Sequence, residues 1–115
     1  MTLVCIDIKF SGRLRDVKVT SYSDNAIFTC ELSKTELDIT WCKDGEELNI
    51  DDGEGRLRTE CYGRTHRLII GQVCSQDAAL YSAVYRQCPH NSISTSAVLI
   101  VLRMSSIHCH VLCKR

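Results

Sequence analysis

The chain has 115 residues, enough for one domain of ordinary size, and 44 % of them are hydrophobic while 24 % are charged. This balance is typical of a globular domain with a core, and it excludes a disordered chain. Fourteen basic residues face fourteen acidic ones, so no overall charge points to nucleic acid or a membrane surface as a partner.

The N-terminus does not have the pattern of a secretion signal. Residues 1–6 lack a basic stretch, and Asp7 interrupts the apolar run before it is long enough. No segment approaches the roughly 20 apolar residues that a membrane helix needs. There is also no Asn-x-Ser/Thr sequon, because Asn91-Ser92-Ile93 misses it by one position. These three absences favour a cytosolic location.

The rest of the chain alternates between apolar and polar residues with a period of two, which is typical of half-buried β-strands. Turn-forming residues, such as those of Lys43–Glu46 and Asp52–Gly55, separate the alternating runs. Only Ser75–Leu80 favours a helix, of one turn at most. The number and spacing of the runs predict an all-β sandwich or barrel. The predicted strands are Val4–Lys9, Leu14–Thr20, Asn25–Leu32, Ile39–Lys43, Arg56–Glu60, Thr65–Ile70, Ala79–Arg86 and Ser94–Leu102.

Specific motifs indicate which family of β-sandwich domains the chain resembles. Cys30 lies at the centre of a predicted strand, Trp41 follows it by eleven residues, and Asp77–Ala83 has the pattern Asp-x-Ala-x-Tyr-x-Ala. Over about residues 10 to 102 the chain resembles the immunoglobulin I-set domain, which implies a Greek-key sandwich of two antiparallel sheets. The segments that carry the resemblance are Leu14–Thr20, Phe28–Cys30, Ile39–Gly45, Arg64–Ile70 and Asp77–Ala83.

The resemblance implies structural roles for six residues. Tyr81 takes the place of the corner tyrosine, whose ring is buried while its hydroxyl bonds a nearby backbone group. The main departure from the family is Ala83, which stands where a second bridging cysteine would be; lesser ones are Ala79 in place of glycine and a Ser21–Asp24 turn without Glu-Gly. The expected structural residues are Cys30, Trp41, Leu68, Asp77, Tyr81 and Ala83. We expect the domain to span residues 1–102 and an irregular tail to span residues 103–115.

Eight cysteines in a chain of this length would normally indicate a secreted disulfide framework. The resemblance argues against one, because Cys30 would face Ala83 and have no bridging partner. A disulfide contributes about 2–4 kcal/mol, but it would not persist in a reducing cytosol, so its loss costs little there. We therefore expect most of the others to be free thiols on outward-facing strand positions, in loops or in the tail: Cys5, Cys42, Cys61, Cys74, Cys88, Cys109 and Cys113.

The sequence contains only weak matches to metal-binding or catalytic motifs. The tail contains possible zinc ligands in His108, Cys109, His110 and Cys113, but no second cysteine pair closes a site, and we favour chance ligands. Asp51–Glu54 is too short for a calcium loop. No papain-like pair, serine triad or phosphate-binding glycine loop is recognisable. The sequence therefore predicts a chain that is not an enzyme and that needs no metal or cofactor.

The charges are unevenly distributed along the chain. Residues 31–54 carry nine acidic and two basic side chains, whereas residues 55–115 carry eight basic and two acidic ones. Such asymmetry can steer a partner, or it can leave two halves of one domain lying against each other. We favour an ordinary solvated surface.

Without a catalytic motif, function is expected at the surface. Edge strands offer unpaired backbone groups to another chain, and Val4–Lys9 and Ser94–Leu102 would form one such edge. An immunoglobulin-like domain without the inter-sheet bridge resembles the tandem modules of intracellular muscle and cytoskeletal proteins. Examples are proteins of the titin, obscurin, myosin-binding protein C and myosin light chain kinase type. The resemblance implies a cytoplasmic, non-enzymatic module that carries load and binds sarcomeric or cytoskeletal proteins and neighbouring domains.

Two alternatives remain at this point. An extracellular recognition module of a receptor or adhesion protein would bind its ligand through loop tips such as Lys34–Asp38 and Cys88–Asn91. An accessory domain of a larger kinase would leave catalysis outside this chain. The absent bridge, sequon and signal favour the intracellular module over the extracellular one.

Overall fold

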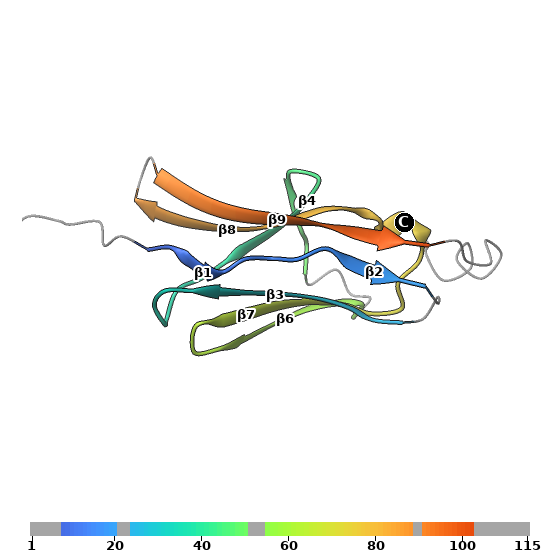
Figure 1. The fold of residues 1–115 in the computed structure, drawn as a ribbon, viewed down its shortest axis with the longest axis horizontal. Coiled ribbons are helices and arrows are strands. Elements are labelled where there is room, and N and C mark those ends of the chain that lie inside the picture. The colour runs from blue at the N-terminus through green and yellow to red at the C-terminus, as the bar shows by residue number, and fades with distance from the viewer. Residues whose placement is uncertain (1–7, 21–23, 51–54, 89–90, 103–115) are drawn as a thin grey trace, which may run out of the picture.

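The computed structural model describes residues 8–20, 24–50, 55–88 and 91–102, and at positions 87, 88 and 91 it describes the backbone alone. These residues form two β-sheets that lie one above the other (Figure 1). Sheet A has the strand order β1-β3-β7-β6, and sheet B has the order β2-β9-β8-β4-β5. The strands of sheet A are β1 (Phe10–Gly12), β3 (Ala26–Leu32), β6 (Leu57–Tyr62) and β7 (Thr65–Ile70); those of sheet B are β2 (Val17–Val19), β4 (Thr40–Lys43), β5 (Glu46–Glu47), β8 (Ala79–Cys88) and β9 (Asn91–Val101).

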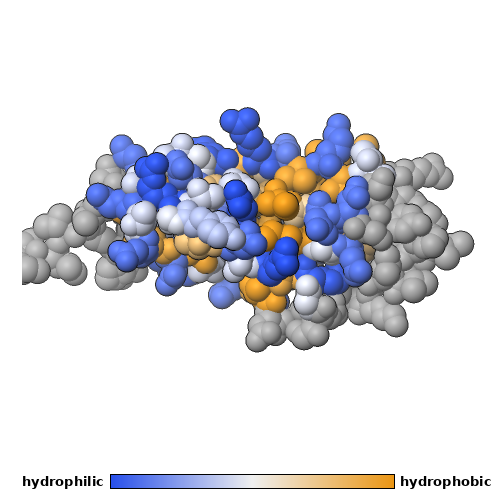
Figure 2. All heavy atoms as spheres, turned by 90° about the horizontal axis from the view of Figure 1, so that it is seen from below, coloured by the Kyte–Doolittle hydropathy of each residue, from blue (hydrophilic) through white to orange (hydrophobic). Residues whose placement is uncertain are grey.

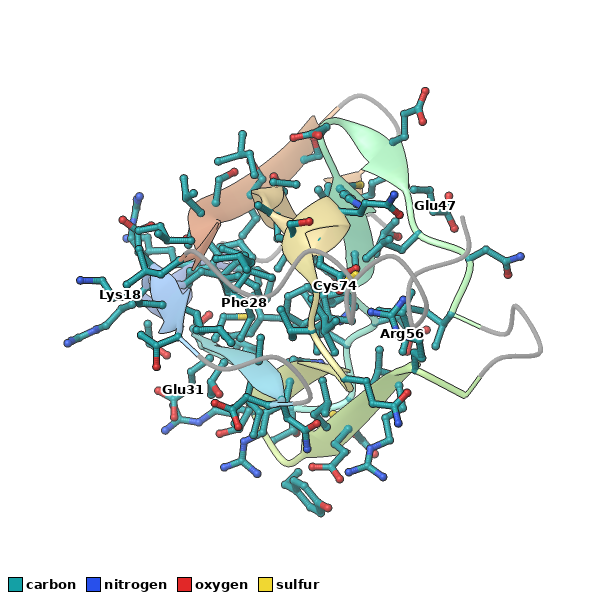
Figure 3. The ribbon with its side chains drawn as sticks, turned by 90° about the vertical axis from the view of Figure 1, so that its right-hand side faces the viewer. Lys18, Phe28, Glu31, Glu47, Arg56 and Cys74 are labelled. Carbon is teal, nitrogen blue, oxygen red and sulfur yellow. The ribbon has the colours of Figure 1, made fainter. Side chains whose placement is uncertain are left out.

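The period-two pattern explains why the sheets pack face to face. In β3 the side chains at positions 26, 28, 30 and 32 are buried, while those at 27 and 29 are exposed. Because successive side chains on a strand point to opposite faces, one face of each sheet is apolar and closes against the other. Phe28 lies between the two layers in Figure 3, and Leu68 and Ile70 are fully buried beside it in the same core.

The N-terminal segment joins both sheets. β1 pairs antiparallel with β3, and β2 then pairs parallel with β9, with Val17 opposite Leu99. Between them the amide of Leu14 donates to Oγ1 of Thr95 at 3.1 Å. The predicted all-β immunoglobulin-like sandwich is confirmed, and this β2–β9 pair makes sheet B mixed rather than purely antiparallel.

Several element boundaries differ from the predicted ones. The expected strand Val4–Lys9 lies partly outside the described residues, and Ile8 and Lys9 belong to no strand, because β1 begins at Phe10. A register shift between Phe10 and Gly12 accompanies a close approach to β3, since a Cβ at Gly12 would lie 3.2 Å from Glu31 Cβ. The two-residue β5 was not predicted, because it is too short to alternate.

The remaining elements follow the pattern more closely. β9 begins three residues before the predicted Ser94, at Asn91. The single helical turn expected within Ser75–Leu80 is a 3-10 helix, η1 (Ser75–Asp77). It leads directly into β8, and its last residue, Asp77, is buried.

Candidate functional site

The residues expected to form the structural centre lie in the core. Cys30, Trp41, Leu68, Tyr81 and Ala83 are all buried, and Trp41 is the cross-strand neighbour of Ala83 in sheet B. Cys30 comes from the other sheet, where it lies opposite His66 of β7. The indole and the thiol therefore fill one layer between the sheets, with alanine at the position of the second sulfur.

Tyr81 has the geometry of a corner tyrosine. Its hydroxyl donates to the backbone carbonyl of Asp77 at 2.6 Å, four residues earlier. The ring packs on Phe28 with a centroid separation of 5.1 Å and a tilt of 33°. A buried aromatic ring whose polar end is satisfied by the backbone holds the start of β8 against the opposite sheet.

Arg56 is a structural residue that the sequence reasoning missed. Its Nη2 lies 2.5 Å from Oδ2 of Asp77, and the side chains of this ion pair are 7 % and 1 % exposed. Its Nε and Nη2 also donate to the carbonyls of Gly71 and Gln72 at 3.1 and 3.2 Å, while Nη1 is buried without a hydrogen-bond partner. Figure 3 shows Arg56 beside Cys74 at one end of the sandwich. The usable signal was Asp77 itself, since a buried carboxylate requires a cation or several donors.

The free cysteines occupy very different environments. Cys30, Cys42 and Cys61 are reduced; the first is buried, the second half-buried and the third exposed. Burial raises the pKa of the Cys30 thiol to about 12, so this thiol stays protonated at neutral pH. The predicted absence of a bridge at Cys30 is confirmed.

The expectation of a free, accessible thiol is wrong for Cys74. This residue is fully buried and disulfide-bonded, and its amide donates to Oδ2 of Asp77 at 3.0 Å. It lies in the core directly before η1, and its burial was not predicted because the residues around it do not alternate between apolar and polar. Cys5, Cys109 and Cys113 lie outside the described residues, as does the side chain of Cys88.

The candidate metal ligands cannot be placed. His108, Cys109, His110 and Cys113, like Asp51–Glu54, lie outside the described residues. Among the residues that are described, no group of three or more His, Cys, Asp or Glu side chains could hold a metal ion. In the same part of the chain, no helix has the length and apolar character needed to cross a membrane.

The outer face of sheet A is charged and internally paired. Arg67 lies between Thr29 and Glu60 in register, with Nη1 3.9 Å from Glu60 Oε1 and its guanidinium 5.7 Å from the ring of Tyr62. Arg64 lies 3.8 Å from Glu31. Figure 2 views the molecule from this side and shows hydrophilic side chains around an apolar strip. Solvent and salt screen the attraction within such exposed pairs, so the pairs contribute little to stability.

The outer face of sheet B carries two exposed aliphatic side chains, with the carboxylates of Asp44 and Asp16 beside them, since these accept from the amides of Leu80 and Val98. Leu80 and Val98 are cross-strand neighbours that remain 44 % and 39 % exposed, and Ser82 and Ser96 in the next row share a hydrogen bond of 2.7 Å. Strand β4 adds Cys42 to the same row. A surface of aliphatic and hydroxyl side chains resembles the core of protein–protein interfaces more than ordinary solvated surface.

The predicted edge formed by Val4–Lys9 and Ser94–Leu102 is wrong for the end of β9, because β2 covers Leu99–Val101. In the described part of the chain, β9 pairs with β2 only there, so the first half of the strand has an open side. Asp16 partly caps it, since its Oδ1 accepts from the amide of Val98 at 2.8 Å. Among the described residues, the backbone groups nearer the start of β9 face no strand on this side and are suited to pairing with another chain.

The loop before β4, proposed above as a ligand-binding tip, borders a surface hollow. The hollow has a volume of about 400 Å³ and is lined by the side chains of Glu36, Leu37, Asp38, Thr40, Tyr85 and Arg86. Its charges come from both signs and it is wide open to solvent. The other tip, Cys88–Asn91, lies largely outside the described residues.

These features define a β-sandwich with a corner tyrosine, a buried Arg–Asp pair and a core tryptophan beside an unbridged cysteine. The family model of the immunoglobulin I-set domain matches residues 8–101, and the chain belongs to this family. Over 61 residues it is 39 % identical to mouse (Mus musculus) cardiac-type myosin-binding protein C, and over 77 residues 29 % identical to Drosophila melanogaster titin; these stretches cover 53 % and 67 % of the chain. The chain spans only 5 % of the length of the mouse relative.

Solved structures agree with the sequence relatives. The structure Titin-A168169 superposes with a TM-score of 0.70 at 28 % identity, covering 82 % of this chain and 47 % of that one. The titin domains z1z2 in complex with telethonin give 0.74 at 18 % identity, covering 90 % and 51 %. The Ig1-2 module of the Drosophila receptor tyrosine phosphatase DLAR gives 0.72 at 20 %, covering 85 % and 50 %. The last two show the shared fold alone.

Proposed function

We propose that this I-set domain is a non-enzymatic module of a larger sarcomeric or cytoskeletal protein in the cytoplasm, where it spaces neighbouring domains and binds other muscle proteins. The observation that carries the proposal is the reduced Cys30 in a core whose second bridge position is Ala83. Two sheets that pack without an inter-sheet bridge suit a reducing compartment. The likeness to myosin-binding protein C and titin supports the sarcomeric setting.

The surface proposed for binding is the outer face of sheet B around Leu80 and Val98, together with the open side of β9. The two side chains are exposed, apolar and cross-strand neighbours, whereas on the outer face of sheet A the exposed Ile27 shares the surface with two ion pairs. The partners to test first are myosin and telethonin, because the similar proteins are a myosin-binding protein and a titin pair in complex with telethonin.

A titration of the purified domain against each protein tests this surface. We expect binding to one of them, and a loss of at least about tenfold in affinity for Leu80→Asp or Val98→Asp, because a charge would be buried at the interface. Ile27→Asp is the matched control, since Ile27 is 49 % exposed on the outer face of sheet A. Equal losses for all three variants would contradict the assignment of the face, and no binding to either protein would contradict the choice of partners.

Load bearing is part of the proposal. β2 and β9 run parallel, with Val17, Lys18 and Val19 opposite Leu99, Ile100 and Val101. A pull on the two ends of the domain would act along these strands in opposite directions, so their hydrogen bonds would be loaded together in shear. Single-molecule stretching should show one cooperative unfolding event, and extension at negligible force would contradict a mechanical role.

The domain limits are proposed as 1–102, with a separate tail over 103–115; the family match over residues 8–101 supports this division. A chain ending at residue 102 should keep the melting temperature of the full chain. A drop of many degrees in the shortened chain would mean that the tail belongs to the domain.

The extracellular alternative has one observation in its favour, the disulfide at Cys74. A cytoplasmic domain must keep its fold when that bond is reduced, whereas a secreted domain would lose about 2–5 kcal/mol. Melting with and without a reducing agent distinguishes the two settings. We expect a change of only a few degrees, and unfolding at 37 °C under reducing conditions would favour the recognition module.

A further inference from the structure

A cleft of about 300 Å³ opens along the β6 side of the sandwich, where the short β5 leaves the space between the sheets uncovered. The Trp41 side chain lines it from sheet B, and Cys61 and His66 line it from sheet A. Asp38, in the loop before β4, adds a carboxyl group to its wall, whereas the side chain of neighbouring Glu60 pairs with Arg67 on the outer face of sheet A. None of these groups takes part in the binding surface proposed above.

Cys61 and His66 form a pair within this cleft. They lie directly opposite each other in the antiparallel ladder of β6 and β7, so their side chains share the inner face of the sheet. The Cys61 Sγ lies 3.9 Å from Nε2 of His66 and 3.7 Å from the carbonyl oxygen of Gly63. The thiol is exposed, whereas the imidazole is only 4 % exposed. The nucleophile is accessible and its neighbouring base is shielded.

The imidazole is held in its neutral form, which offers a lone pair to the thiol, while burial makes the ring a weaker base than a free imidazole. Burial lowers the pKa of His66, and the nearby charge of Asp38 opposes this only in part. A neutral ring with its proton on Nδ1 presents the lone pair of Nε2 to the thiol. Cys30 also lies opposite His66 on β3, whereas Glu60 and Arg67 pair with each other on the outer face of the sheet.

The other free thiols lack this combination. Cys30 is buried, and its pKa of about 12 keeps it protonated and unreactive. Cys42 is half-buried on the outer face of sheet B, where its cross-strand neighbours are Ser82 and Glu47. Only Cys61, among the cysteines whose side chains are described, has both access to solvent and a ring nitrogen within 4 Å.

We propose that Cys61 is a modification site, at which small disulfide compounds exchange with a thiol that His66 deprotonates. The proton of Cys61 passes to Nε2 of His66, and the thiolate attacks one sulfur of the disulfide. The disulfide bond of the small molecule breaks as the bond to Cys61 Sγ forms. The departing half leaves as a thiolate and takes the proton back from His66, so that Cys61 is oxidised and the compound is reduced to one thiol.

The charge in the cleft selects the class of compound. Asp38 places a carboxylate in the cleft wall, near enough for its charge to act on the ring of His66. A disulfide that carries amino groups should therefore concentrate in the cleft, while an anionic one should be repelled. The preferred class is the small cationic disulfide, of which cystamine is an example.

The test measures the rate of mixed-disulfide formation at each cysteine of the folded full chain. Trypsin releases Cys61 in residues 59–64 and Cys42 in residues 35–43, each as the only cysteine of its peptide, so mass spectrometry reads the two rates separately. With cystamine at neutral pH we expect Cys61 to react about tenfold faster than Cys42. Oxidised glutathione should react roughly threefold slower than cystamine at Cys61. Equal rates at the two cysteines would overturn the proposal.

Substitutions distinguish the effect of His66 on the reaction rate of Cys61 from the effect of solvent exposure alone. His66→Gln should slow Cys61 to the rate of Cys42 and leave Cys42 unchanged. Asp38→Asn, on the surface loop, should reduce the preference for cystamine without changing the fold. Modification should also alter the emission of Trp41, the single tryptophan, in the wild type but not in Cys61→Ser. Full reactivity of Cys61 in folded His66→Gln would overturn the role of the ring.

Discussion

The two ends of β6 show opposite ways of finishing a sandwich. Directly before the strand, Arg56 is buried and joined to Asp77, and the Asp77 carbonyl accepts from Tyr81, so polar groups close the end of the core. Near the other end of the strand, the sheets stay apart and Cys61 faces an open cleft beside His66. The comparison teaches that stability and reactivity are separated along one strand: the closed end should dominate the free energy of unfolding, and the open end should respond to pH and chemistry.

The largest effect is expected at the closed end. Arg56→Ala leaves the buried carboxylate of Asp77 without its cation, which should cost about 3–5 kcal/mol in the free energy of unfolding. Urea unfolding at neutral pH measures it. Arg58→Ala, an exposed arginine two residues away on β6, should change the free energy of unfolding by less than about 0.5 kcal/mol. Equal losses for the two arginine variants would show that the closed end does not dominate the free energy of unfolding.

A smaller loss is expected for Tyr81→Phe. The change keeps the ring on Phe28 but removes the hydroxyl that bonds the Asp77 carbonyl, and a buried hydrogen bond contributes about 0.5–1.5 kcal/mol. Thermal unfolding measures the loss. Tyr62→Phe, on the outer face of sheet A with the tyrosine 60 % exposed, is the matched control and should be neutral. A neutral Tyr81→Phe variant would mean that the ring alone holds the corner.

At the open end the expected effect is a pH dependence. Burial lowers the pKa of His66 in the folded state, so below about 6.5 the unfolded chain binds a proton that the folded chain resists. The stabilising contribution is present above the unfolded pKa and is lost as the pH falls toward the folded one. Unfolding curves between neutral and mildly acidic pH should therefore show falling stability, less steep in His66→Gln. Identical slopes for the two proteins would contradict a protected imidazole.

The smallest effect belongs to the exposed ion pairs. Glu60→Gln breaks a contact of 3.9 Å between partly exposed side chains, and the loss should stay below about 0.5 kcal/mol and shrink further in high salt. A loss comparable to that of Arg56→Ala would remove the distinction between the two ends.

The sequence could predict what depends on local pattern and on family motif. The alternation along Ala26–Leu32 indicated the inward face of β3, and Asp77 and Tyr81 marked the corner, because these signals lie within a few residues of one another. Arg56 and His66 were missed as buried residues, because a charged or polar side chain gives no periodic sign of burial and its partners lie across the fold. The two-residue β5 and the start of β1 depend on pairing partners rather than on their own residues.

The burial of Cys74 was likewise missed, because it depends on contacts across the fold. Its neighbours in the sequence suggested an accessible loop thiol, yet it is fully buried and disulfide-bonded. Burial at this position follows from the tertiary packing of the segment before η1, which no single stretch of residues encodes. The family motif placed the unbridged Cys30 correctly, because its alternative partner position, Ala83, can be read from the motif itself.

The parallel pairing of β2 with β9 has a consequence for how the domain folds. Val17 meets Leu99, and the Leu14 amide meets Thr95, so a segment made early in synthesis has no place in sheet B until the last strand is complete. Contacts between such distant residues close large loops and form slowly. On the ribosome, the domain should therefore stay open until β9 has emerged from the exit tunnel, and translation pauses before that point should expose the inner faces of both sheets to chaperones.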